Sequence, residues 1–161
     1  MIEAWKKYKW YVLTGLAVVV LVFLHFFKMT QIPYGLNVDE VAAAYDAYNI
    51  ANYGVDRYLK SYPVYFTNYR DGQNALYIYI TAGLFRLFGA SKITIRVSVA
   101  VLAVAAAFFG YGYMAQHLKE RQAKVIWLCL YAILPIFVMT QRFGLESHLL
   151  LPLSMAALFV T

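Results

Sequence analysis

Four long apolar runs alternate with polar stretches along the 161-residue chain. They cover residues 11–27, 94–115, 125–140 and 149–161. A helix needs about 20 apolar residues to cross the roughly 30 Å of hydrocarbon in a bilayer, and the first three runs approach that length. The pattern therefore predicts an all-α integral membrane fold: a polytopic helical bundle of about four transmembrane helices, with juxtamembrane helices outside it.

A shorter apolar segment, residues 74–89 (NALYIYITAGLFRLFG), lies between the first two runs. Basic residues gather on the cytoplasmic side of membrane spans, and two basic clusters, at 6–9 and 119–124, qualify as cytoplasmic. An even number of crossings must join these clusters, so one of the three apolar segments between them does not cross. We expect this segment to be 74–89, lying as a helix on the outer leaflet with its tyrosines and Arg86 at headgroup level.

The resulting topology describes a multi-pass cell-membrane protein with a cytoplasmic N-terminus. Its predicted segments are a cytoplasmic start (1–9), a span (10–28), an external loop with juxtamembrane helices (29–93), a span (94–116), a cytoplasmic turn (117–124), a span (125–141), an external turn (142–147) and the start of a further span (148–161). In the alternative topology residues 74–89 cross the membrane, which moves 119–124 outside and separates the loop acids from the 142–147 turn.

Composition agrees with a membrane location. Hydrophobic residues make up 63% of the chain and charged residues 14%, with a mean hydropathy of +0.59, so one soluble core could not bury the apolar surplus. The net charge of +6 is spread over membrane boundaries, so we expect no nucleic-acid partner. Residues 1–27 also fit a signal peptide, but bulky residues at 25–28 replace a cleavage site and favour an uncleaved span. The single cysteine, Cys129, excludes a disulfide framework.

The external loop opens with a helix signal. Asn37 and Glu40 have the spacing of a capping box, and Gly54 marks the end of the helix. Asp39 and Glu40 can therefore be simple capping acids, which the positive end of a helix dipole favours. They also follow the first span closely enough to lie at the outer membrane surface, where a carboxylate can act as general base on an acceptor hydroxyl or amine. Both interpretations are open from the sequence.

Tyrosines are frequent in the same loop, and they suit either the membrane interface or stacking on carbohydrate. They are Tyr34, Tyr45, Tyr48, Tyr53, Tyr58, Tyr62, Tyr65 and Tyr69. Arg70 offers a guanidinium fork for a phosphate group, or alternatively a surface ion pair with Asp71. We place Arg70, Arg142 and Tyr69 in a candidate substrate- and phosphate-binding set, and we expect a turn at the Asp71-Gly72 pair.

The second external turn carries Arg142, Glu146 and His148. Arg142 and Glu146 are four residues apart, so they can form an ion pair on one helix face. In the preferred topology Glu146 shares the external face with Asp39, and the two carboxylates can build one site. A single histidine beside a glutamate is a weak metal signal, so we predict no metal site.

The ordered series of features resembles GT-C membrane glycosyltransferases, and most closely the dolichyl-phosphate-mannose protein mannosyltransferase and aminoarabinose transferase type. The resemblance is carried by Asp39-Glu40 after the first span, the tyrosine-rich loop, LYIYITAGLFRLFGASKITIRVSVAVLAV and QRFGLESHLLLPLSMAALFV. It implies transfer of a sugar from a polyprenyl-phosphate carrier to an acceptor protein or glycolipid at the external face. It also implies that Asp39 is the catalytic base, that Glu40 completes the acidic pair, and that Glu146, preceded by Arg142, helps build the same pocket.

Two departures limit what the resemblance implies. The Glu-Lys-Pro-Pro-like stretch of aminoarabinose-type members is replaced here by residues 68–73, so Arg70 is the expected substitute for the lysine and the donor sugar is open. The similar region is about the first third of a typical member, so we expect a truncated chain that is inactive without the missing C-terminal part. Membrane lipid and the lipid-linked sugar are the implied partners, and a divalent metal requirement is open.

Two other function classes stay open. A transporter or flippase subunit would carry ionisable groups at mid-membrane depth, whereas these apolar runs are nearly free of them. In a structural or assembly membrane protein, Asp39 and Glu40 would only cap a helix, and their loss would affect stability alone.

Overall fold

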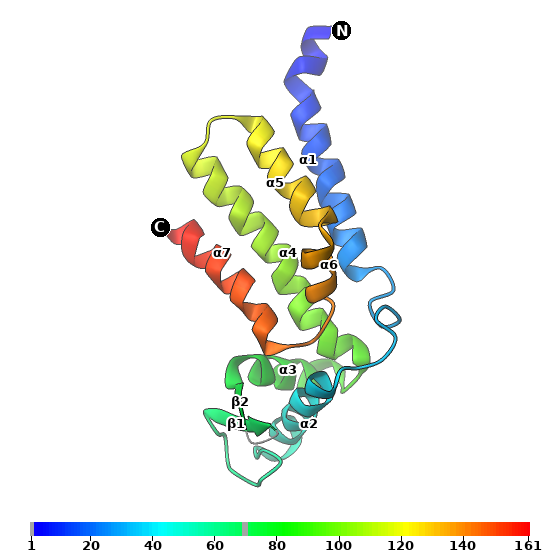
Figure 1. Cartoon of the computed structure of the whole chain (residues 1–161), viewed down its shortest axis with the longest axis vertical. Coiled ribbons are helices and arrows are strands. Elements are labelled where there is room, and N and C mark those ends of the chain that lie inside the picture. The colour runs from blue at the N-terminus through cyan, green and yellow to red at the C-terminus, as the bar shows by residue number, and fades with distance from the viewer. Residues whose placement is uncertain (1, 69–70) are drawn as a thin grey trace.

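The computed structural model describes residues 2–68 and 71–161. Its elements are α1 (Ile2–Phe26), α2 (Val38–Tyr53), β1 (Tyr65–Asn68), β2 (Asp71–Asn74), α3 (Ala75–Phe88), α4 (Lys92–His117), α5 (Arg121–Ile133), α6 (Pro135–Thr140), the 3-10 helix η1 (Glu146–Leu149) and α7 (Leu150–Val160). Helices α1, α4, α5 and α7 lie side by side and, with α6, form the bundle (Figure 1). Helices α2 and α3 and the two strands gather at one end of it; we call residues 27–91 the end region.

Two helices of the described chain are long and apolar enough to cross a membrane: Tyr8–Phe26 and Lys92–His117. They correspond to the predicted spans at 10–28 and 94–116. Ala75–Phe88 and Glu146–Val160 are shorter apolar helices. The fold is therefore mostly helical with two candidate membrane-spanning helices, and the complete four-span arrangement stays a prediction.

The predicted span at 125–141 is wrong as one continuous helix. It is divided into α5 and α6 at Leu134, whose backbone is extended (φ −66°, ψ 124°). The cause is Pro135, which has no N–H to donate and whose ring disfavours helical geometry at the preceding residue. Proline is well tolerated at the first position of a new helix, so α6 starts there.

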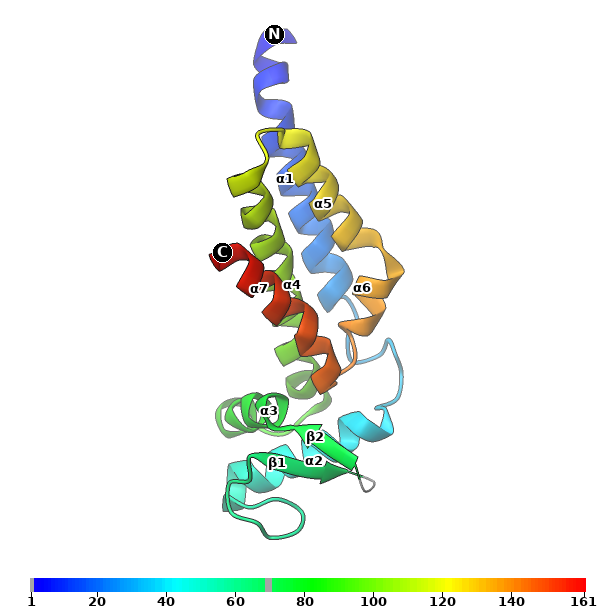
Figure 2. The ribbon, with the colours of Figure 1, turned by 60° about the vertical axis from the view of Figure 1, so that its left-hand side comes forward.

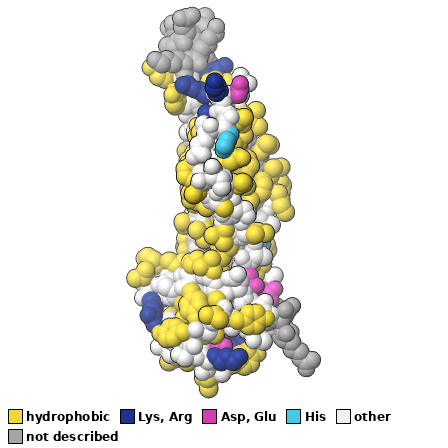
Figure 3. Space-filling model, turned by 90° about the vertical axis from the view of Figure 1, so that its left-hand side faces the viewer, with side chains coloured by type: hydrophobic (Ala, Val, Ile, Leu, Met, Phe, Trp, Pro, Cys, Tyr) yellow, Lys and Arg dark blue, Asp and Glu magenta, His cyan; other side chains and the backbone are white. Residues whose placement is uncertain are grey.

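The bundle core is made largely of small side chains. Ala17, Ala106, Ala107 and Ala132 are buried around Leu128. These small residues let the helix backbones approach closely, which is how helices associate where lipid removes the usual hydrophobic drive. Leu21 and Tyr131 are buried in the same core, whereas many other large apolar side chains of the bundle face outward. Figure 3 shows hydrophobic side chains along the middle of one face with Lys and Arg toward its two ends.

Helix α3 lies across the end of the bundle instead of running alongside its helices (Figures 1 and 2). The N-terminal part of α1 and the α4–α5 connection are both at the opposite end of the bundle (Figure 1). This arrangement is the one expected if residues 74–89 do not cross the membrane. Arg86 donates to the Ala51 carbonyl at 2.7 Å, so its side chain ties α3 to α2.

The end region also contains a β-hairpin, which corrects the all-α prediction. Strands β1 and β2 pair antiparallel, with Thr67 opposite Gly72 and Asn68 opposite Asp71. The Asp71-Gly72 pair therefore lies in a strand, and the predicted turn at these two residues is wrong. A Cβ at Gly72 would stand 2.0 Å from the Tyr65 hydroxyl oxygen, so the absent side chain makes room for the Tyr65 ring.

Candidate functional site

A pocket of about 290 Å³ opens where α2, the hairpin and the loop before η1 meet. Its lining consists of Asp39, Asn68, Gly72, Gln73, Leu145, Glu146 and Ser147. The structure thus brings Asp39 and Glu146 to one pocket although 107 positions separate them in the sequence (146 − 39). This is the juxtaposition that the sequence analysis expected; the chemical role of the two acids stays a prediction.

Helix capping positions Asp39. The Asn37 side chain accepts a hydrogen bond from the Asp39 backbone N–H at 3.0 Å, and the Asn37 N–H donates to Glu40 Oε2 at 2.8 Å. The capping box predicted from the sequence is therefore confirmed, and Gly54 ends the helix in the left-handed conformation as expected. The box draws the Glu40 side chain back toward Asn37 and leaves the Asp39 side chain exposed at the pocket. Asn68 Nδ2 donates to Asp39 Oδ1 at 3.1 Å.

The pocket is rich in oxygen atoms that lack a donor. Asn68 Oδ1, Gln73 Oε1 and Glu146 Oε2 are buried and have no hydrogen-bond partner among the described residues. A buried polar atom without a partner costs roughly 1–3 kcal/mol, so these oxygens favour a ligand that supplies donors or positive charge. Hydroxyl groups and amines are such ligands.

The pKa of the Glu146 carboxyl is raised above the ordinary glutamate value. Burial is the main cause, and the negative charge of Asp39 adds to the rise. Hydrogen bonds from the Asn74 backbone and the Gln73 side chain oppose the shift. Two nearby carboxyls in unlike surroundings are a common arrangement for acid and base chemistry.

The same oxygen atoms are of the type that hard divalent cations prefer. Two carboxylates, from Asp39 and Glu146, and two amide oxygens, from Asn68 and Gln73, line the pocket. Over the described part of the chain, no group of three or more His, Cys, Asp or Glu residues is placed to hold a metal. A cation there would therefore need the amide oxygens as ligands.

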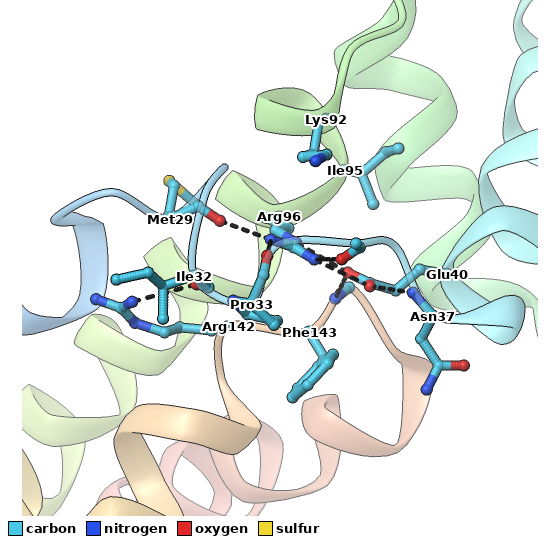
Figure 4. Close-up of polar contacts among 12 residues, drawn as sticks. Met29, Ile32, Pro33, Asn37, Glu40, Lys92, Ile95, Arg96, Arg142 and Phe143 are labelled. Atoms are coloured by element: carbon cyan, nitrogen blue, oxygen red, sulfur yellow. Dashed lines mark hydrogen bonds and ion pairs between the residues drawn. The ribbon is translucent and has the colours of Figure 1, made fainter.

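Glu40, which was expected to complete the acidic pair with Asp39, does not line the pocket. Its side chain is fully buried and forms an ion pair with Arg96, with Nε 3.1 Å from Oε1 and Nη2 3.2 Å from Oε2 (Figure 4). The Gly144 N–H also donates to Glu40 Oε1 at 2.7 Å. Both carboxylate oxygens are occupied, so Glu40 joins the start of α2 to α4 and to the loop before η1.

Arg96 is the residue that sequence reasoning missed. Besides the two bonds to Glu40, it donates to the carbonyls of Met29 and Pro33 at 2.8 Å and of Gly35 at 2.6 Å. These contacts match the five N–H donors of a guanidinium. A signal was available, because Arg96 is the one charged residue within the apolar run 94–115 and a buried cation needs a carboxylate partner.

Arg142 also lies away from the pocket, contrary to its predicted phosphate-binding role. Its guanidinium donates to the carbonyls of Leu24, Phe27 and Ile32, and the side chain is nearly fully buried. The end of α1 leaves carbonyl groups without helical partners, and a basic side chain satisfies them. The i, i+4 ion pair with Glu146 is accordingly not formed.

The remaining sequence candidates add no further group to the pocket. Tyr69 and Arg70 lie outside the described residues. His148 Nδ1 is 3.1 Å from the Phe143 carbonyl oxygen.

An apolar groove of about 350 Å³ adjoins the polar pocket. The two share Glu146 and Ser147. The rest of the groove is lined by Asn74, Leu76, Leu149, Leu150 and Leu153. The surface between α3 and α7 therefore changes from polar to apolar over a short distance, which suits a ligand with a polar head and a hydrocarbon tail.

No protein-family model, no curated protein and no solved structure matches this chain. A functional assignment therefore rests on the residues and the geometry described above.

Proposed function

We propose that this chain forms the external acid-containing pocket of a membrane glycosyltransferase that takes its sugar from a polyprenyl-phosphate carrier. The observation that carries the proposal is the meeting of Asp39 and Glu146 in one pocket, at the end of the bundle opposite the basic α4–α5 turn. The resemblance to GT-C enzymes points to the same two acids. Further parts of such an enzyme would complete the donor site.

Asp39 is the general base of this proposal. The acceptor hydroxyl oxygen attacks the anomeric carbon, the bond from that carbon to the phosphate oxygen breaks, and polyprenyl phosphate leaves with the bonding electrons. The acceptor proton passes to the Asp39 carboxylate. The unpartnered oxygens of Asn68 and Gln73 accept hydrogen bonds from hydroxyl groups of sugar or acceptor, and Glu146 helps to orient them.

The apolar groove supports a lipid-linked substrate. It begins at Glu146 and continues along Leu149 and Leu153 of η1 and α7. An isoprenoid chain lying there would hold its phosphate and sugar beside the polar pocket. Because Arg142 is bound to backbone carbonyls, the phosphate contact falls to residues other than Arg142.

Photo-crosslinking tests this proposal without requiring turnover. The probe is a farnesyl-phosphate-linked hexose with a diazirine on the sugar, added to the chain in lipid nanodiscs. We expect crosslinks on peptides that contain residues 72–73 and 145–147, competed by the unmodified compound and weakened by Gln73→Leu. Glu120→Gln, an exposed change at the other end of the bundle, is the control and should leave labelling unchanged. Labelling that avoids both peptides would refute the proposal.

A further inference from the structure

A second polar pocket lies at the opposite end of the bundle, where the N-terminal part of α1 meets α4 and the start of α5. It measures about 210 Å³ and is lined by Trp10, Tyr11, Thr14, Tyr111, Arg121, Lys124 and Val125. Three helices contribute to it, and it has no part in the acid-containing pocket. We infer that this pocket binds the phosphate headgroup of an anionic phospholipid.

The charge of the pocket is the first argument. Arg121 and Lys124 lie one turn apart on α5 and both line it. Among the side chains of residues 8–68 and 72–161, neither forms an ion pair with a carboxylate, and the Glu120 side chain makes no hydrogen bond to the α5 N-terminus. The two cations are therefore available for an external anion. An arginine fork and a lysine point charge together suit a phosphate group.

The second argument is the set of neutral donors and aromatic rings around these cations. The guanidinium of Arg121 lies over the Tyr11 ring, 5.1 Å from its centroid, which holds the side chain at the pocket. The Trp10 indole N–H and the Tyr111 hydroxyl also belong to pocket residues, and neither has a hydrogen-bond partner among the described residues. Tryptophan and tyrosine are the residues enriched at headgroup depth.

The third argument is location. The pocket lies at the end of the bundle that contains the α4–α5 connection and the N-terminal part of α1, which belong to the predicted cytoplasmic segments 117–124 and 1–9 or adjoin them (Figure 1). Basic pockets between membrane helices on the cytoplasmic side are typical sites for anionic headgroups. A lipid seated there would join α1 to α5. A soluble phosphate would use the same donors but would gain nothing from the apolar helix surfaces below them.

Lipid retention measured by native mass spectrometry tests the inference. The wild-type chain, in mixed detergent micelles with equal amounts of phosphatidylglycerol and phosphatidylcholine, should retain phosphatidylglycerol preferentially. Arg121→Gln/Lys124→Gln should reduce that preference about thirtyfold, because each basic side chain near an anionic surface contributes about fivefold. Arg121→Lys, which keeps the charge, should lose much less.

Lys60→Gln/Lys119→Gln is the matched control, since it removes two exposed charges outside the pocket. It should retain phosphatidylglycerol as the wild type does. Three results would overturn the inference. They are an unchanged preference in the Arg121/Lys124 variant, an equal loss in the control, and displacement of the lipid by excess inorganic phosphate, which would identify the ligand as a free anion.

Discussion

The bundle and the end region are built on different principles, although the same chain passes between them. The bundle core packs alanines such as Ala106 and Ala107 around a few large buried side chains, among them Tyr131, and many of its other large apolar side chains face outward. The end region buries large rings, Phe66 and Tyr77, and surrounds them with directed polar contacts. Close approach is sufficient to hold helices together, whereas a pocket needs hydrogen bonds that fix the direction of each side chain.

The largest expected effect comes from breaking the ion pair that joins the two regions. Arg96→Met leaves Glu40 buried without its partner, so the end region should lose about 3–5 kcal/mol of stability. Hydrogen exchange followed by mass spectrometry should show this loss in α2 more than in α5. Glu40→Gln/Arg96→Met should recover part of it, because no unpaired charge then remains buried. Equal exchange in wild type and Arg96→Met would contradict this role for the pair.

Asp39→Asn separates function from structure within the end region. Asparagine keeps the shape of the side chain but accepts no proton, so sugar transfer by the complete enzyme that carries this substitution should fall at least about 100-fold in a membrane assay. Exchange protection of α2 should change little, because Asp39 is exposed. If transfer persists at the wild-type rate, Asp39 is only a helix-capping residue.

Gly144→Ala probes the tight contact between the loop before η1 and the end region. A Cβ there would meet Tyr77 Oη at 2.3 Å and the Ile95 carbonyl oxygen at 3.0 Å. The Tyr77 hydroxyl is fixed because it donates to that carbonyl at 2.8 Å. We expect a loss of about 1–3 kcal/mol from overpacking, measured by thermal unfolding in detergent. Gly83→Ala, with open space around the new methyl group, is the control and should be neutral or stabilising.

The corresponding test in the bundle is Gly110→Ala. Its Cβ would stand 2.4 Å from a ring carbon of Trp127, and the Trp127 indole N–H is held by the Ala107 carbonyl at 3.1 Å. The ring can shift more easily than a backbone carbonyl, so we expect about 1 kcal/mol of destabilisation. Gly15→Ala in α1 meets nothing within 4 Å and should be tolerated. A larger loss at Gly110 than at Gly144 would reverse the ranking of the two regions.

The smallest effect concerns pH. Since the pKa of Glu146 is raised in the folded chain, the folded state binds more protons than the unfolded state between the ordinary value of 4.5 and the raised one. Stability should therefore fall as pH rises through that interval. Glu146→Gln should flatten this part of the profile, as thermal unfolding across pH would show. A profile that the substitution leaves unchanged would exclude Glu146 as its source.

Local signals in the sequence were sufficient for the framework of the molecule. Apolar run length located α1 and α4, the capping spacing located the start of α2, and Gly54 located its end. These features depend on residues within one or two turns of each other, so a single sequence carries them. Pro135 was an equally local signal, and giving it more weight would have predicted the break between α5 and α6.

The site could be predicted only in part. The shared location of Asp39 and Glu146 was predicted by a topology argument that counts membrane crossings from the distribution of basic residues. The contacts of Glu40 and Arg142 could not be predicted from the sequence, because each depends on which buried group lies nearby once the chain is folded. Residue type alone does not distinguish a buried structural arginine from an arginine that binds substrate.

The sequence by itself therefore determined the helical character, the apolar spans and the position of the acids along the chain, since these follow from local periodicity and composition. Only the tertiary structure decided which acid faces the pocket, that Arg96 neutralises Glu40, and that Arg142 closes the end of α1. The physical reason is that a buried charge must be paired and a free carbonyl must find a donor. Those partners are separated by 56 positions for Glu40 and Arg96 and by 115 for Phe27 and Arg142.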